Sequence, residues 1–175
     1  QLRLPVLAVL AYGLSTVATR TPEELAPHIG NQGWFQLYPP GDGEIRRDLL
    51  KRAKDSGFHT LILTVDVPVA SRRERQRRAR LSNPMRITPR VLAEVAMRPA
   101  WALAMVTNGI PKLATLEKYA KVDANLPSTA HIGYLLRTAP DWAYLDVLRS
   151  EWDGKLVVKG VTDAADARAC DKAGA

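Results

Sequence analysis

Side chains that could do chemistry gather in the segment His59–Arg80, HTLILTVDVPVASRRERQRRAR. An apolar, β-branched run ends in Thr64 and Asp66, and a cluster of arginines follows it. A continuous apolar run of this kind predicts a strand buried on both faces, and Pro68 ends the strand because it cannot donate a ladder hydrogen bond. A hydroxyl, a carboxylate and guanidinium groups at the carboxyl end of a buried strand are typical of active sites in parallel α/β barrels. The same spacing also fits a core strand followed by a solvated basic loop.

Most of the excess positive charge lies in that loop. The net charge of the chain is +7, and residues 72–80 hold six arginines and one glutamate, which together contribute +5. Three interpretations are open: a nucleic-acid patch, a contact with an anionic membrane, and a loop whose arginines bind small carboxylates. No aromatic residues are interleaved with the arginines and no known nucleic-acid module accompanies them, so we do not expect nucleic acid to be a partner.

The composition is that of an ordinary globular domain. The chain has 175 residues, of which 46% are apolar, so residues 1–175 are expected to form one domain with a real core. No apolar segment reaches the length of about 18 residues that a bilayer-spanning helix requires. The single cysteine, Cys170, excludes an internal disulfide and suggests a reducing compartment, so we expect a cytoplasmic protein. The sequence contains no closely spaced set of metal ligands and no glycine-rich phosphate loop, so we predict no metal site.

Strands and helices alternate along much of the chain. Strands are predicted at 4–9, 34–38, 59–66 and 155–160, and helices from Thr21, from Asp42 to Gly57, at 91–97, at 99–105, at 140–152 with Trp142, Leu145 and Leu148 on one side, and from Thr162 to Gly174. A strand, a helix and a strand within about thirty residues form a βαβ unit with a parallel sheet. Residues 107–138 show little periodicity, so we expect a long loop or lid region at about 81–139.

The carboxyl ends of the predicted strands carry polar side chains at several points. They offer Ser15 and Thr16, Gln36 and Tyr38, Thr64 and Asp66, Arg73, and Lys159. Because the ends of parallel strands meet on one side of a barrel, this common placement favours a single pocket. Lys159 is costly to bury without a partner, so we expect it to meet an anion or a cofactor atom.

Four segments occur in an order that matches a known family. They are Leu14-Ser15-Thr16, Trp34-Phe35-Gln36-Leu37-Tyr38, Thr64-Val65-Asp66-Val67-Pro68 with Arg72-Arg73-Glu74, and Leu156-Val157-Val158-Lys159-Gly160. With them, the sequence resembles the FMN-dependent 2-hydroxy acid dehydrogenases and oxidases, which include glycolate oxidase, L-lactate dehydrogenase and mandelate dehydrogenase. Residues 89–119 most resemble the mandelate and lactate dehydrogenase branch. The resemblance covers nearly the whole chain, and it implies a (β/α)8 TIM barrel of which this chain supplies roughly the first half.

The resemblance also implies a cofactor, a reaction and a role for each matching residue. FMN would be the cofactor, and the enzyme would oxidise a small L-2-hydroxy acid of the lactate or mandelate type to the 2-oxo acid with hydride transfer to the flavin. Tyr38 and Arg73 would bind the substrate, and Asp66 would pair with the catalytic histidine, so that Asp66 and Tyr38 are the catalytic candidates in this chain. The cofactor-binding candidates are Ser15, Gln36, Thr64 and Lys159.

Two parts of the family pattern have no match here. The family's catalytic histidine stands in a Ser-Asn-His-Gly-Gly-Arg motif that would lie beyond Ala175, as would the phosphate-binding glycines, and Leu10-Ala11 stands where a Pro-Thr-Gly-type turn is expected. We therefore expect that residues 1–175 do not turn over a 2-hydroxy acid unaided. The alternative is a non-catalytic basic binding module, or an inactive barrel fragment, that uses the arginine-rich loop 72–80.

The resemblance extends to partners. It implies an electron acceptor, either quinone or oxygen, and a homo-oligomer in the intact enzyme. Contact of the 81–139 region with a membrane is a further hypothesis, with the protein peripheral at the inner face of that membrane.

Overall fold

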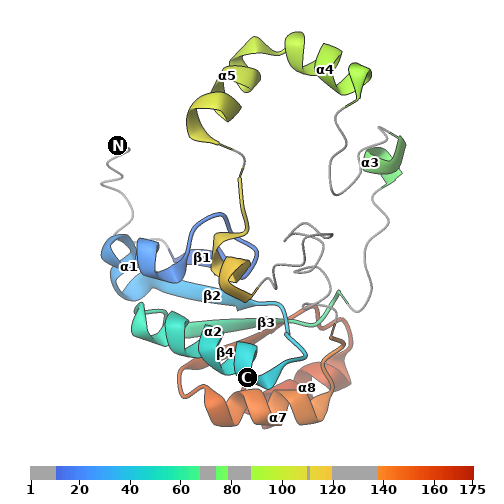
Figure 1. The fold of residues 1–175 in the computed structure, drawn as a ribbon. Coiled ribbons are helices and arrows are strands. Elements are labelled where there is room, and N and C mark those ends of the chain that lie inside the picture. Colours follow the sequence, from blue (N-terminus) through green and yellow to red (C-terminus); the bar gives the residue numbers. More distant parts are fainter. Residues whose placement is uncertain (1–10, 68–73, 79–87, 110, 120–137) are drawn as a thin grey trace.

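A four-stranded parallel sheet lies at the centre of the protein (Figure 1). The computed structural model describes residues 11–67, 74–78, 88–109, 111–119 and 138–175. The strands, in spatial order, are β1 (Tyr12–Ser15), β2 (Gly33–Leu37), β3 (Thr60–Thr64) and β4 (Lys155–Lys159). The predicted parallel α/β arrangement is confirmed, whereas the strand predicted at 4–9 lies outside the described residues.

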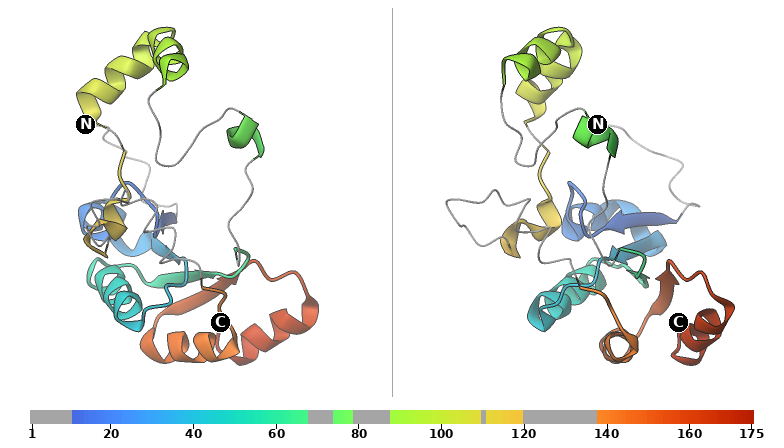
Figure 2. Two further views of the ribbon diagram at one scale, coloured as in Figure 1. Left: turned by 45° about the vertical axis from the view of Figure 1, so that its right-hand side comes forward. Right: turned by 90° about the vertical axis from the view of Figure 1, so that its right-hand side faces the viewer.

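Helices connect the strands and cover one face of the sheet. The helices next to the sheet are α1 (Pro22–Ile29) with the short 3-10 helix η1 (Gly30–Gln32), α2 (Gly43–Asp55), α7 (Trp142–Glu151) and α8 (Ala164–Lys172). In the views of Figures 1 and 2, α2, α7 and α8 lie on the same side of the strands. Strands that follow one another both in sequence and in space, with helices on one face only, have the winding of a barrel, since an open doubly wound sheet carries helices on both faces. The fold is therefore part of a (β/α)8 barrel.

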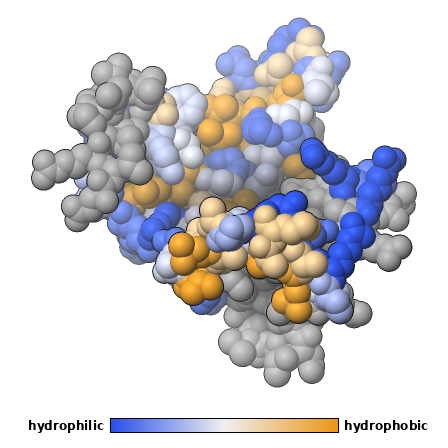
Figure 3. Space-filling model, turned by 90° about the horizontal axis from the view of Figure 1, so that it is seen from above, coloured by the Kyte–Doolittle hydropathy of each residue, from blue (hydrophilic) through white to orange (hydrophobic). Residues whose placement is uncertain are grey.

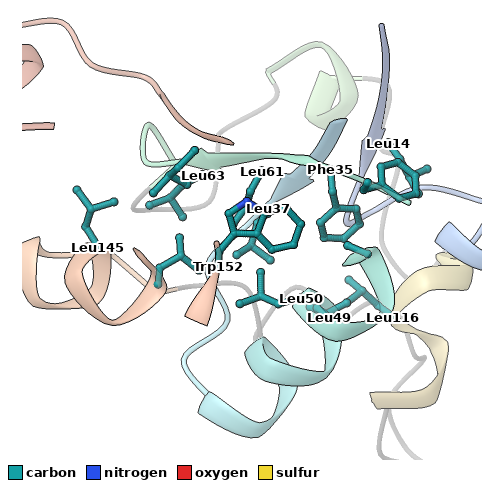
Figure 4. Packing of buried hydrophobic residues seen from close by; sticks show 14 of the residues in the cluster. Leu14, Phe35, Leu37, Leu49, Leu50, Leu61, Leu63, Leu116, Leu145 and Trp152 are labelled. Atoms are coloured by element: carbon teal, nitrogen blue, oxygen red, sulfur yellow. The ribbon is translucent and has the colours of Figure 1, made fainter. Parts of the chain in front are cut away.

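The hydrophobic core fills the space between the sheet and these helices (Figure 4). The strand register places four buried side chains side by side across the sheet, namely Leu14, Phe35, Leu61 and Leu156. Phe35 meets Phe58 edge to face at a ring-centroid distance of 6.0 Å. The alternate residues of the strands point to the opposite face, where Trp34 is 37% exposed. That face corresponds to the interior of a complete barrel.

Polar side chains cap the amino ends of α1, α2 and α8. Thr21 forms the predicted capping box with Glu24, and Asp42 caps α2 as expected. The prediction that Thr162 caps the last helix is wrong by one residue. Asp163 is the cap, because its carboxylate accepts hydrogen bonds from the N–H groups of the two residues that follow Ala164.

The apolar side predicted for α7 is buried over part of its length. Leu145 and Leu148 are buried as expected, but Trp142 is 49% exposed. Trp142 is the first residue of the helix, after the N-cap Asp141, and so lies at the margin of the layer that packs on the sheet.

A long excursion separates β3 from α7. Its described elements are α3 (Glu74–Arg78), α4 (Pro89–Ala96), α5 (Pro99–Asn108) and the 3-10 helix η2 (Ala114–Tyr119). The two helices predicted from residues 91 and 99 are confirmed, with Thr88 as the cap of α4. In Figures 1 and 2, α4 and α5 stand away from the sheet, and we call residues 88–109 the arm.

The 3-10 helix η2 follows the arm in sequence and packs against the core of the protein. Leu116 is fully buried in the core, and the Thr115 hydroxyl donates to the carbonyl of Arg20 at 3.0 Å. Arg52 of α2 donates to the carbonyl of Thr115 at 2.8 Å. The sequence showed no element here because a 3-10 helix lacks the 3.6-residue repeat that marks an α-helix.

Candidate cofactor and substrate site

Polar side chains line the edge of the sheet formed by the carboxyl ends of the strands. The register pairs Ser15 with Gln36 on β1 and β2, and Thr64 with Lys159 on β3 and β4. The four predicted cofactor-binding residues thus share one edge. Tyr38 follows β2 and Asp66 follows β3 at the same edge. Arg73, the predicted substrate-binding arginine, lies outside the described residues.

Three of these side chains form a continuous hydrogen-bonded row across β1, β2 and β3. The Ser15 hydroxyl donates to Gln36 Oε1 at 2.5 Å, and Gln36 Nε2 donates to the Thr64 hydroxyl at 2.7 Å. With both ends of the amide engaged, the orientation of Gln36 is fixed by the network. The Thr64 hydroxyl accepts from Gln36, and among the described residues no acceptor takes its own proton, which could be donated to a ligand.

The fourth strand adds an ion pair to this row. Lys159 Nζ lies 2.8 Å from Asp66 Oδ2, and the two side chains are 55% and 41% exposed. The hydrogen bond between them lowers the pKa of Asp66 and raises the pKa of Lys159. The resemblance assigned Asp66 to a histidine, whereas the partner seen in the described part of the chain is Lys159.

Gly160 makes the approach of Asp66 to β4 possible. Its φ is +107°, a conformation that side-chain-bearing residues rarely adopt. A Cβ atom at this position would lie 2.5 Å from Cβ of Asp66. Gly160 was part of a sequence motif but was given no role of its own, because neither its φ nor its neighbour is visible in the pattern.

Thr16 was expected among the polar residues at the strand ends, but the sequence indicated no role of its own for it. It is fully buried, and its hydroxyl contacts the backbone of both Gln36 and Tyr38. It follows Ser15 in the motif Leu-Ser-Thr, but strand alternation places it on the face opposite to Ser15, where an apolar residue is the usual occupant.

The chemistry of this edge fits one side of a flavin ring. Two hydroxyls and an amide supply donors and acceptors in a row, which suits a pyrimidine edge with alternating carbonyl and N–H groups. Lys159 supplies a cation at the end of the row, where negative charge on the ring would be stabilised. The residues present therefore fit FMN.

Known proteins similar to this chain include L-lactate dehydrogenases. The chain is 37% identical over 168 residues to an L-lactate dehydrogenase of Pseudomonas aeruginosa, a match that covers 94% of this chain and 43% of that protein. An L-lactate dehydrogenase of Vibrio cholerae is 35% identical, with 95% of this chain and 44% of that protein covered. The chain thus spans less than half the length of these relatives.

A solved structure of a related enzyme is also similar to this chain. The crystal structure of the monotopic membrane protein (S)-mandelate dehydrogenase superposes with a TM-score of 0.84 at 32% identity, over 94% of this chain and 44% of that one. In the part of this chain that the structure describes, none of the helices has the length and apolar character needed to cross a membrane. Residues 7–175 match the model of the FMN-dependent dehydrogenases, and the chain belongs to that family.

Proposed function

We propose that the protein to which this chain belongs oxidises a small L-2-hydroxy acid, of the lactate or mandelate type, to the 2-oxo acid with hydride transfer to FMN. The observation that carries the proposal is the row formed by Ser15, Gln36 and Thr64, with Lys159 on the neighbouring strand. The curated relatives named L-lactate dehydrogenase and the mandelate dehydrogenase structure support this substrate class.

The row would hold the pyrimidine edge of FMN. Gln36 and Thr64 would hydrogen-bond the edge, and Ser15 fixes the Gln36 amide in the orientation that this requires. Lys159 would lie near N1 and the C2 carbonyl of the flavin. When bound, FMN supplies the acceptor for the two electrons that leave the substrate.

Two side chains would bind the substrate, and a third would assist the base. Arg73 would bind its carboxylate through two N–H groups, a task that suits a guanidinium, and Tyr38 would hydrogen-bond the substrate from the end of β2. Asp66 would stabilise the protonated form of a histidine base. Lys159 donates to Oδ2 of Asp66. The other carboxylate oxygen, Oδ1, could accept a hydrogen bond from an imidazole N–H of the histidine.

Titration of the complete enzyme, freed of its flavin, with FMN tests the cofactor site and is followed by flavin fluorescence. Gln36→Leu removes the amide that is proposed to hydrogen-bond FMN, together with its bonds to Ser15 and Thr64. FMN binding should therefore weaken about tenfold, the effect of losing one or two net hydrogen bonds. Gln32→Leu is the matched control, because Gln32 lies in η1 at the opposite end of β2. Absence of FMN binding by the unaltered complete enzyme, or equal effects of the two substitutions, would contradict the proposal.

Substrate and acceptor are tested in the complete enzyme. Anaerobic bleaching of the flavin by L-lactate or by mandelate identifies the 2-hydroxy acid, and bleaching by neither refutes the proposed reaction. Quinone and oxygen are both proposed as acceptors, and hydrogen peroxide formed in air separates an oxidase from a dehydrogenase. We also propose a homo-oligomer located in the cytoplasm, at the inner face of the membrane.

The arm is the part that we propose to meet the membrane. Figure 3 shows orange hydrophobic patches on the face of the protein that is seen from above. The large hydrophobic residues that the arm exposes are Leu92, Met97, Trp101, Leu103 and Val106. Helix α5 has the sequence PAWALAMVTN, without a charged residue. Its ten residues span about 15 Å, half the thickness of a hydrocarbon core, so α5 would lie in the interface rather than cross it. The monotopic character of the similar mandelate dehydrogenase supports the same assignment.

Sedimentation with phospholipid vesicles tests this contact. Leu103→Glu combined with Val106→Glu should abolish co-sedimentation, because a charge at each position opposes burial in the interface. Val147→Glu is the control, since Val147 is a similarly exposed apolar residue on α7. Equal binding of both variants would rule out the arm as the membrane contact.

A further inference from the structure

A single buried hydroxyl joins the two strands that carry the candidate site. Thr16 lies just after β1 and is 0% exposed. Its Oγ1 donates to the carbonyl oxygen of Gln36 at 2.6 Å and accepts from the backbone N–H of Tyr38 at 3.1 Å. One side chain thus holds the backbone on both sides of Leu37, between a proposed flavin ligand and a proposed substrate ligand.

The contact replaces a bond of the regular parallel ladder. Thr16 N–H donates to the carbonyl of Gln36 at 2.9 Å, as the register from Ser15 and Gln36 requires. If the ladder continued, the N–H of Tyr38 would donate to the main-chain carbonyl of Thr16. Instead it donates to the Thr16 side chain. The hydroxyl therefore extends the pairing of β1 and β2 to Tyr38, beyond the last residue of β2.

We propose that Thr16 is a positioning residue that sets the places of Gln36 and Tyr38 together, an inference that rests on the function proposed above. The Gln36 side chain is held by Ser15 and Thr64 on one face of the sheet, and its carbonyl is held by Thr16 at the strand end. Loss of the Thr16 hydroxyl leaves the Tyr38 N–H without its acceptor, which favours displacement of the segment 36–38. A displacement of that segment would move flavin ligand and substrate ligand at once.

Amide hydrogen exchange tests the structural part of the proposal without a flavin. Thr16→Val keeps the shape of the side chain and removes the hydroxyl, whereas Thr16→Ser keeps the hydroxyl. Protection of the Tyr38 amide should fall about tenfold in Thr16→Val, as loss of one net hydrogen bond implies, and should be retained in Thr16→Ser. Thr60→Val is the matched control, because Thr60 is a buried threonine of the same sheet whose hydroxyl has no partner among the described residues.

The affinity of the complete enzyme for FMN tests the functional part of the proposal. FMN affinity should fall about five- to tenfold in Thr16→Val and stay close to the unaltered value in Thr16→Ser and Thr60→Val. If the unaltered complete enzyme shows a protected Tyr38 amide but binds no FMN, the proposed function fails and the pairing by Thr16 stands. If FMN binds equally to the unaltered enzyme and to Thr16→Val, the positioning role fails and the proposed function stands. A Tyr38 amide that exchanges in the unaltered enzyme as fast as an unstructured peptide overturns the inference even if Thr16→Val does not fold.

Discussion

Replacing Glu151 with glutamine should loosen the attachment of α7 to the body of the protein. Arg46 of α2 binds Glu151 of α7 through two hydrogen bonds, Nε to Oε2 at 2.7 Å and Nη2 to Oε1 at 2.9 Å. The guanidinium also lies 5.2 Å from the ring centroid of Tyr144. Since α7 immediately precedes β4, this pair fastens the strand that carries Lys159 to the earlier part of the sheet.

The expected loss follows from the burial of the pair. The side chains of Arg46 and Glu151 are 10% and 19% exposed. Breaking a fully buried ion pair costs about 3–5 kcal/mol, and an exposed pair contributes about 0–1 kcal/mol. For partial burial with two-point geometry we expect Glu151→Gln to lower the free energy of unfolding by about 2 kcal/mol at neutral pH.

The pH dependence gives the same prediction a second check. The hydrogen bond from Arg46 lowers the pKa of Glu151 below its ordinary value of 4.5. The folded pKa is thus below the unfolded one, so the stabilisation is complete above pH 4.5 and is lost as the pH falls through the lowered folded value. The difference between the unaltered chain and Glu151→Gln should therefore shrink on acidification.

Urea unfolding followed by circular dichroism measures both effects. Asp55→Asn is the control, because it breaks the Lys51–Asp55 pair, whose side chains are 72% and 61% exposed, and should cost less than about 0.5 kcal/mol. Equal losses in the two variants, or a Glu151→Gln loss that grows in acid, would refute the reasoning.

Three other substitutions test separate parts of the account. Thr60→Val should leave the free energy of unfolding unchanged or raise it by up to about 1 kcal/mol, since the buried hydroxyl has no partner among the described residues; a loss above that size in urea unfolding would show an unrecognised bond. Lys159→Met should move the NMR titration of the Asp66 carboxyl to higher pH, because the lysine lowers that pKa; an unmoved titration contradicts the pair. In the complete enzyme, Arg73→Lys should raise KM more than Arg77→Lys, and equal effects would mean that the arginines act as a diffuse charge.

Local patterns predicted the parts of the fold that local chemistry determines. The capping box at Thr21, the cap at Asp42 and the strand that ends in Thr64 each depend on residues close in sequence, and all three are found. The common edge of the candidate site was also predictable, because the carboxyl ends of successive parallel strands must meet on one side.

Contacts between distant segments were not predictable in this way. The buried η2 depends on Arg52 and on the carbonyl of Arg20, both far from Thr115 in sequence. The pairing of Lys159 with Asp66 joins residues separated by the whole excursion between β3 and β4. No pattern in a single sequence encodes such long-range contacts, because they form only when the strands are placed side by side.

Binding of a flavin at the carboxyl edge of this sheet is tested most directly by NMR of the isotope-labelled complete enzyme, freed of its flavin and titrated with FMN. We expect saturable shifts of the Gln36 side-chain amide and of the amides of Ser15, Thr64 and Lys159. Residues at the amino ends of the same strands, such as Trp34 and Lys155, should not shift. Shifts confined to those amino ends, or no saturable shift at any concentration of FMN, would contradict flavin binding at this edge.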